Sequence, residues 1–225
     1  MDFLYQKSIS PSGIAVEEIF GAEEKSAKVW KLFAMQIFSE ADGDYRCIEH
    51  YDNGAPLLDG VPQRISVSHT SHYLAVASIP KTPDIDLSEV NVRTAIGIDA
   101  EVADRRQVLR VRDKFLSADE CRMLPAIDDP EEADDEVVKA CILAWTCKEA
   151  MYKAVLGAAA DWKEDYKILA LPKIAPDLRA ATSGLYGKAV VNVSGSGPID
   201  LLLSSWQSGR HILTLAFSKK IPIYK

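Results

Sequence analysis

The chain has 225 residues, 48% of them apolar and 26% charged, a composition typical of soluble globular proteins and sufficient for one large domain or two small ones. Its formal net charge of −7 disfavours general binding to nucleic acid, so an anionic ligand would need a local cluster of cations. No apolar run reaches the ~20 residues that span a bilayer, so no membrane segment is expected.

The first ten residues, MDFLYQKSIS, lack the basic region and apolar core of a signal peptide. The four cysteines, at positions 47, 121, 141 and 147, form neither a CxxC motif nor a disulfide-like framework. We therefore expect free thiols and a cytoplasmic location.

In the N-terminal half, strand and helix patterns alternate with turns. Residues 13–20 predict a strand, and residues 22–38 predict a helix with apolar residues near helical spacing. A turn-rich connector at 52–62 is followed by two predicted strands, 65–67 and 73–79, around a short polar turn. After an exposed loop, residues 93–103 return to strand character.

In the C-terminal half, the pattern becomes helical from Asp113, with Ser117 or Asp119 as the cap of a short helix. An acidic loop leads into a long helix over about 136–156. Residues 157–184 are predicted to be loop with some helix, and residues 188–219 to be an antiparallel meander. Both halves run helix and then strands, which suits a two-lobed α+β protein.

Two acidic residues share one face of the strand AIGIDAE. Side chains alternate along a strand, so Asp99 and Glu101 point away from Ile96 and Ile98. Two carboxylates this close repel each other unless a cation lies between them, and oxygen ligands suit a hard divalent cation. An exposed edge strand with solvated acids is the alternative.

The long helix has one apolar and one mixed face. On a helical wheel its core face gathers Leu143, Cys147, Ala150, Met151 and Ala154. The opposite face gathers Trp145, Lys148, Glu149, Tyr152 and Lys153. Glu149 and Lys153 could be a plain surface pair contributing ~0.3–0.5 kcal/mol. Aromatic residues beside the charges suit a metal-bound polyphosphate better.

The segment SVSHTS adds Ser68 and His69, which can donate hydrogen bonds to phosphate oxygens. A nucleophilic Ser68 with His69 as its base is disfavoured, because adjacent residues on a strand point apart. Taken alone, His69 is more typical of a structural histidine.

Together these pieces resemble the signature of the 4′-phosphopantetheinyl transferases: Ser68-His69, then Gly97-Ile98-Asp99-x-Glu101, then Trp145-x-x-Lys148-Glu149-x-x-x-Lys153. The resemblance is firm over roughly residues 53–156, and the length is similar to the larger, monomeric type that activates peptide and polyketide synthetases. It implies an α+β fold with two similar, pseudo-symmetric lobes, 1–95 and 96–225, each an antiparallel sheet packed with a long helix. The active site would lie at the lobe interface.

The resemblance also implies roles for individual residues. Asp99, Glu101 and Glu149 would hold Mg²⁺, and Ser68 and His69 would grip a phosphate of coenzyme A. Lys153 would contact phosphate and stabilise the leaving group, and Lys148 would assist. Glu149, or a metal-bound water, would deprotonate the serine of an acyl, peptidyl or aryl carrier protein, and 3′,5′-ADP would leave.

The sequence departs from the family pattern in three places. Ala55 stands where a basic residue is frequent, and Lys25, Lys28 and Lys31 are unaligned candidates for the 3′-phosphate. The segment after Lys153 lacks the glycine-rich stretch that is usual in the family. Carrier docking is predicted around Trp162, Lys163 and Lys167. A family member that binds without transfer, and a generic Mg²⁺-dependent phosphohydrolase, are the alternatives.

Overall fold

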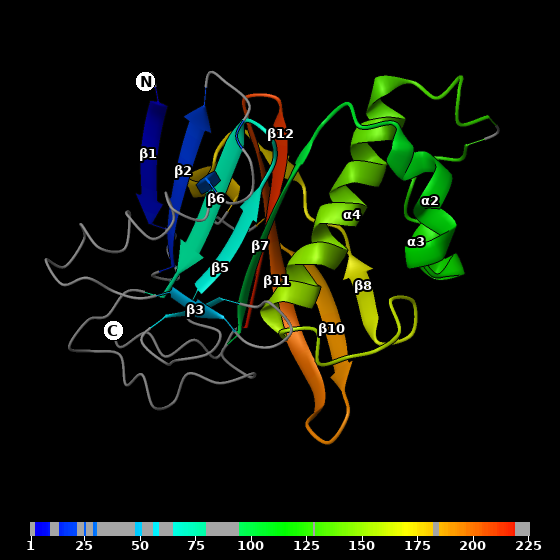
Figure 1. Cartoon of the computed structure of the whole chain (residues 1–225). Helices are drawn as coiled ribbons and strands as arrows, with labels where there is room; N and C mark the ends of the chain where they lie inside the picture. Colours follow the sequence, from blue (N-terminus) through cyan, green and yellow to red (C-terminus); the bar gives the residue numbers. More distant parts are fainter. Residues whose placement is uncertain are drawn as a thin grey trace, which may run out of the picture.

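The computed structural model describes residues 3–9, 14–21, 25, 29–30, 48–50, 56–58, 65–79, 95–127, 129–181 and 185–218 (Figure 1). The helix predicted over 22–38 lies outside these residues, except that positions 29 and 30 are helical. Ala55, Lys28 and Lys31 also lie outside them. The descriptions below apply to the described residues.

The first large sheet is antiparallel and contains strands from the N-terminal part of the chain. In spatial order they are β1 (Phe3–Ile9), β2 (Ala15–Gly21), β6 (Tyr73–Ser78) and β5 (Ile65–His69). The predictions of strands corresponding to β2, β5 and β6 are confirmed, whereas β1 was not predicted. A separate two-stranded sheet pairs β3 (Ile48–His50) with β4 (Pro56–Leu58).

The second large sheet contains strands from the C-terminal part. Its order is β7 (Ile96–Val102), β12 (His211–Ser218), β11 (Gly197–Ser208), β10 (Gly187–Val193) and β8 (Tyr166–Ala170), with β9 (Ile174–Ala175) parallel to β11. The predicted meander is confirmed as β10, β11 and β12. The lobe boundary predicted between residues 95 and 96 falls between β6 of the first sheet and β7 of the second.

Four helices accompany this second sheet: α2 (Gln107–Phe115), α3 (Ala118–Cys121), α4 (Asp135–Ala154) and α5 (Leu178–Ala181). Helix α4 is the predicted long helix, and it starts where the Asp134 side chain accepts the Val137 N–H at 2.8 Å. Ser117 caps α3 in a capping box with Glu120, as one of the two predicted caps. None of the described helices is long and apolar enough to cross a membrane.

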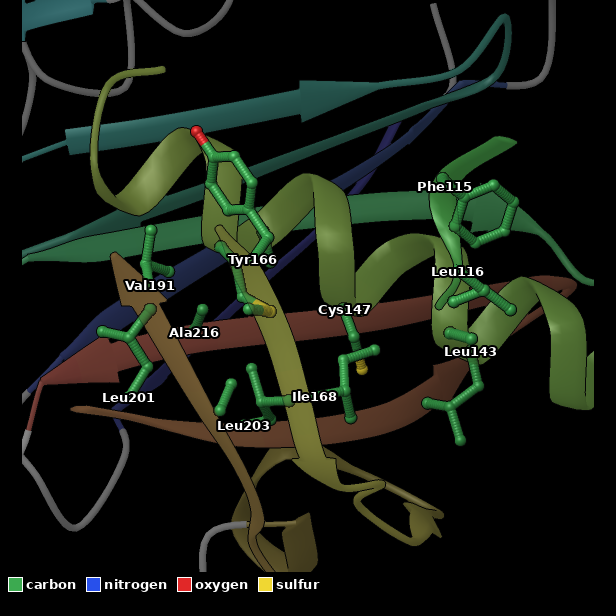
Figure 2. Close-up of a cluster of buried hydrophobic side chains, with 14 of the residues drawn as sticks. Phe115, Leu116, Leu143, Cys147, Tyr166, Ile168, Val191, Leu201, Leu203 and Ala216 are labelled. Atoms are coloured by element: carbon green, nitrogen blue, oxygen red, sulfur yellow. The ribbon is translucent and has the colours of Figure 1, made fainter. Parts of the chain in front are cut away.

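The second sheet lies between α4 and the first sheet, as β12 illustrates. Ile212 and Ala216 belong to the core cluster under α4, whereas Leu213, Leu215 and Phe217 belong to the cluster shared with the first sheet. The side-chain period of two thus buries both faces of β12, which explains its nearly continuous apolar sequence. Figure 2 shows the α4 side, where Cys147 and Leu143 meet Ile168 and Leu203.

The two large sheets meet at their edges through β5 and β7, which lie side by side in Figure 1. The join uses side chains: the Ser66 Oγ accepts the Ile98 N–H at 2.9 Å, and the Ser68 Oγ accepts the Ala100 N–H at 3.1 Å. The structure combines helices with antiparallel sheets, and its two large sheets correspond to two lobes. This confirms the predicted α+β class.

Candidate functional site

Gly97 allows β7 to lie directly against α4. A Cβ at this position would be 2.0 Å from the Ala150 carbonyl oxygen and 2.5 Å from the Ala154 nitrogen, distances that no side chain could occupy. The strand and the helix are therefore in backbone contact. Asp99, two residues further along β7, consequently lies on the face that meets α4.

Asp99 is the point at which three elements meet. Its side chain is buried, and its Oδ1 accepts hydrogen bonds from Lys153 Nζ on α4 at 2.6 Å and from Ser68 Oγ on β5 at 2.9 Å. A charge-assisted bond of this length is among the stronger polar contacts in proteins. Ser68, Asp99 and Lys153, three residues singled out from the sequence, are thus brought together.

Glu149 lies one helical turn before Lys153, close enough to Asp99 and Glu101 for their negative charges to affect its pKa. Burial raises the pKa of Glu149 to about 7, and the negative charge of Asp99 adds to this effect. Lys153 partly opposes the rise in this pKa, and Glu101 reinforces it. This balance shows a site that has more negative than positive charge close to Glu149.

Glu101 faces the start of α2. Its carboxylate forms an ion pair with Arg105 and accepts the Val102 N–H at 2.9 Å. Arg105 was not predicted as a site residue, although its spacing of four from Glu101 is the sequence signal that could have indicated it. Glu101 is therefore near the site but is held by its own local partners.

His69 and Ser68 point apart, as predicted for neighbours on a strand: Ser68 is buried and His69 is exposed. Partial burial lowers the pKa of His69, and the positive charge of Lys153 lowers it further. His69 is thus favoured in its neutral form and lies close enough to Lys153 to feel its charge.

A groove of about 510 Å³ opens beside these residues, between the β5–β6 turn, the end of β7 and the β11–β12 turn. Its lining combines His69 and His72 with Arg105 and Arg210. Arg210 is mostly exposed and lies 3.4 Å from Asp104. Glu101 also lines the groove and pairs with Arg105, and Arg210 pairs with Asp104, so an anionic ligand would compete with these carboxylates for the two arginines.

Lys148 does not join the cluster: it lies on the side of α4 that carries Trp145 and Tyr152, as predicted, but its partners come from other segments. Its side chain is fully buried, 2.7 Å from the Glu120 carboxylate, and it donates to the carbonyls of Trp162, at 2.7 Å, and Tyr166. Five positions along a helix correspond to a rotation of 140° beyond a full turn, so Lys148 and Lys153 point in different directions. Burial lowers the pKa of Lys148, and the hydrogen bond that Lys148 donates to Glu120 opposes that change.

The three predicted metal ligands have the chemistry that suits a hard divalent cation, but they are not gathered around one position. Asp99, Glu101 and Glu149 offer oxygen ligands, and the negative charges of Asp99 and Glu101 near Glu149 are ones that such a cation would offset. In the described part of the chain, however, no three His, Cys, Asp or Glu side chains are gathered closely enough to hold a metal ion. Asp99 and Glu101 are instead engaged by Lys153 and Arg105.

Residues 95–191 match the family model of the 4′-phosphopantetheinyl transferase superfamily. The match runs from the residue before β7 into β10 and contains Asp99, Glu101, Glu149 and Lys153. Ser68 and His69 lie outside it. No curated protein matches the chain.

Proposed function

We propose, from the premise that residues 95–191 are a domain of the 4′-phosphopantetheinyl transferase superfamily, that the protein transfers 4′-phosphopantetheine from coenzyme A to a serine of a carrier protein. The acceptor would be an acyl, peptidyl or aryl carrier protein. The observation that carries the proposal is the meeting of Asp99, Lys153 and Glu149 beside a groove lined by cations.

In the proposed reaction, the serine oxygen bonds to the β-phosphorus of coenzyme A. The bond from that phosphorus to the bridging oxygen breaks, and the electron pair leaves with 3′,5′-ADP. The serine proton passes to Glu149, which acts as the general base. Phosphoryl transfer of this kind depends mainly on positioning and on neutralising charge.

The chain's own cations would meet the phosphates. Arg105 and Arg210 line the groove together with His69, which as a neutral imidazole can donate a hydrogen bond, so these residues are placed to hold the anionic part of coenzyme A. The arginines offer local positive charge to offset the absence of a basic residue at Ala55. Lys153, now on Asp99, would stabilise the charge of the leaving group.

Asp99, Glu101 and Glu149 would hold Mg²⁺ in this proposal. The ion would neutralise phosphate charge and act as a Lewis acid when bound. Because Asp99 and Glu101 are paired with Lys153 and Arg105 in the structure, binding of the ion would compete with these two ion pairs.

The outer face of α4 supports a docking surface for the carrier near the predicted patch. Trp162 lies between two aromatic residues of α4, with ring centroids 6.0 Å from Trp145 and 5.4 Å from Tyr152. Both pairs are nearly parallel, at 1° and 9°. Lys163 follows Trp162, and Lys167 is 3.5 Å from Glu164. We propose that the carrier contacts this loop, and that the transferase is a cytoplasmic monomer.

The transfer assay tests the proposal directly. The full chain is incubated with Mg²⁺, coenzyme A and a panel of apo carrier proteins, and a carrier that gains the mass of phosphopantetheine supports it. Coenzyme A binding without a mass gain on any carrier would instead support the binding-only alternative. Phosphate release without an acceptor would support a phosphohydrolase.

Asp99→Asn and Glu149→Gln provide the matched variants. Each removes one charge and keeps the shape of the side chain, so we expect transfer to fall by at least ~100-fold, since charge neutralisation is central to this chemistry. Glu136→Gln is the control, because Glu136 lies on α4 and contacts Lys139 at 2.7 Å, away from Asp99. Near-normal turnover of Asp99→Asn would refute the proposed site.

A further inference from the structure

We infer that Ser68 is a positioning residue, through which the N-terminal sheet fixes the orientation of the Asp99 carboxylate. The inference rests on the proposed function, because it concerns how that site is built. It gives Ser68 a role different from contact with a phosphate.

The hydroxyl of Ser68 both accepts and donates a hydrogen bond. It accepts the Ala100 N–H at 3.1 Å, so its single proton is left for Asp99 Oδ1 at 2.9 Å. The Ser68 side chain is only 6% exposed, which keeps water from competing for these bonds. The direction of the hydrogen bond to Asp99 is therefore set by the backbone of β7.

Both known donors to Asp99 use the same oxygen. Ser68 and Lys153 bond to Oδ1, and within the described residues no donor bonds to Oδ2. The terminal torsion of an aspartate is soft, so a carboxylate held by one mobile lysine would turn easily. The second donor, on a β-strand, fixes the plane of the carboxylate and, among the described residues, leaves Oδ2 free to accept another partner.

Ser68 also belongs to a different sheet from Asp99. β5 and β7 are joined by the paired hydroxyls of Ser66 and Ser68, which accept the N–H groups of Ile98 and Ala100. A shift of one lobe against the other would therefore move the hydroxyl that holds Asp99. Ser66 makes the same kind of bond but contacts no carboxylate among the described residues. A Ser66 variant therefore tests the joining of the sheets separately from the orientation of Asp99.

The experiment compares Ser68→Ala with Ser66→Ala in the full chain. Mg²⁺ affinity is measured by calorimetry without coenzyme A, and kcat and KM are measured for transfer. Loss of a group that orients a metal ligand typically costs 10–100-fold, so we expect Ser68→Ala to weaken Mg²⁺ binding and kcat by about that factor. The KM for coenzyme A should change by less than about threefold, because on this inference the hydroxyl contacts no phosphate.

Ser66→Ala loses one hydrogen bond that joins the sheets, so it should reduce thermal stability by less than Ser68→Ala, which loses two, and should keep Mg²⁺ affinity and kcat within about threefold. Ser68→Thr, which keeps a hydroxyl, should restore most of the loss. The inference is overturned if the two alanine variants behave alike, if Ser68→Ala raises KM alone, or if the wild-type protein binds no Mg²⁺. Mg²⁺ binding that depends on Ser68 in a protein that modifies no carrier would refute the proposed function and support the inference.

Discussion

Lys148 is a buried cation in the middle of α4, and its partners come from three other segments. Glu120 on α3 supplies the counter-charge and also accepts the N–H groups of Ser117 and Ile168, each at 2.8 Å. Glu120 and Lys148 therefore tie α3, α4 and β8 together. Breaking such a pair on one side is costly because it leaves a buried charge uncompensated.

We predict that Lys148→Met lowers the free energy of unfolding by about 3–5 kcal/mol, because the Glu120 carboxylate stays buried without its ammonium partner. Urea unfolding followed by circular dichroism measures this change. Combining Lys148→Met with Glu120→Gln should cost less than the sum of the two single changes, since both charges are then gone.

Lys139→Met is the control for this prediction. Lys139 lies on the same helix, but its partner Glu136 is exposed, so the unfolding midpoint should hardly change. A Lys148→Met protein that is as stable as the wild type but inactive in transfer would place Lys148 in the chemistry.

At the residue scale, the strand period placed Asp99 correctly, and the helical period placed Lys153 beside Glu149. The wheel did not predict the partners of Lys148, because it gives an angle around one helix and not the neighbours at that angle. Glu120 and the Tyr166 carbonyl, which make the burial of Lys148 favourable, come from segments whose positions no local pattern specifies. Arg210 was missed for the same reason, because only the fold brings it to the groove.

At the scale of elements, the contact between β7 and α4 determines the site. We predict that Gly97→Ala destabilises the fold by about 1–3 kcal/mol through overpacking. It should also reduce kcat by about 100-fold, because pushing α4 away moves Lys153 and Glu149 relative to Asp99. Thermal unfolding and the transfer assay measure the two effects.

Gly195→Ala is the matched control, since its added Cβ meets nothing within 4 Å. Its φ of 78° makes alanine strained, so stability should fall while kcat stays unchanged. If Gly97→Ala and Gly195→Ala had equal effects on kcat, the contact between β7 and α4 would not determine the site.

Elements with strong periodicity were predictable, whereas short or irregular ones such as α2, β1 and β8 were not. Helix α2 is only nine residues long and buries Val108, Leu109 and Phe115, so its apolar stripe covers few positions. The edge strand β1 leaves Leu4, Tyr5 and Ile9 exposed and shows no core-facing alternation. Strand β8 is five residues long and follows a loop, and pairing with β10 stabilises it more than its own sequence pattern does.

At the scale of the whole molecule, His211 lies where the two sheets meet. Its ring stacks on Tyr73 of the first sheet with centroids 4.4 Å apart, and its Nε2 is 3.1 Å from Thr70 Oγ1. Burial lowers the pKa of His211 to about 4, and the nearby positive charge of Arg210 contributes. The junction of the lobes therefore requires a neutral imidazole.

This requirement predicts the sign of an acid effect. Between pH 6.5 and about 4 the unfolded chain binds a proton at His211 that the folded protein does not. The stability that neutral His211 provides is complete above pH 6.5 and is lost as the pH falls. The contribution approaches ~1.4 kcal/mol per pH unit in that window.

Comparing His211→Phe with the wild type isolates this effect, because phenylalanine keeps the stacking on Tyr73 but cannot be protonated. The difference in unfolding free energy between the two proteins should be constant above pH 7 and shift in favour of His211→Phe on acidification. Denaturant titrations from pH 8 to pH 4.5 measure it. A pH-independent difference would show that His211 does not titrate as described.

The stacking of Trp162 between Trp145 and Tyr152 has an optical consequence. The nearly parallel indoles of Trp145 and Trp162 couple their electronic transitions. Packing of the Trp162 loop against α4 therefore gives a near-ultraviolet signal that neither ring has alone. Movement of the loop would change that signal while leaving the helix content intact. Binding of a carrier to this loop would therefore be detectable from the near-ultraviolet signal, without an attached dye.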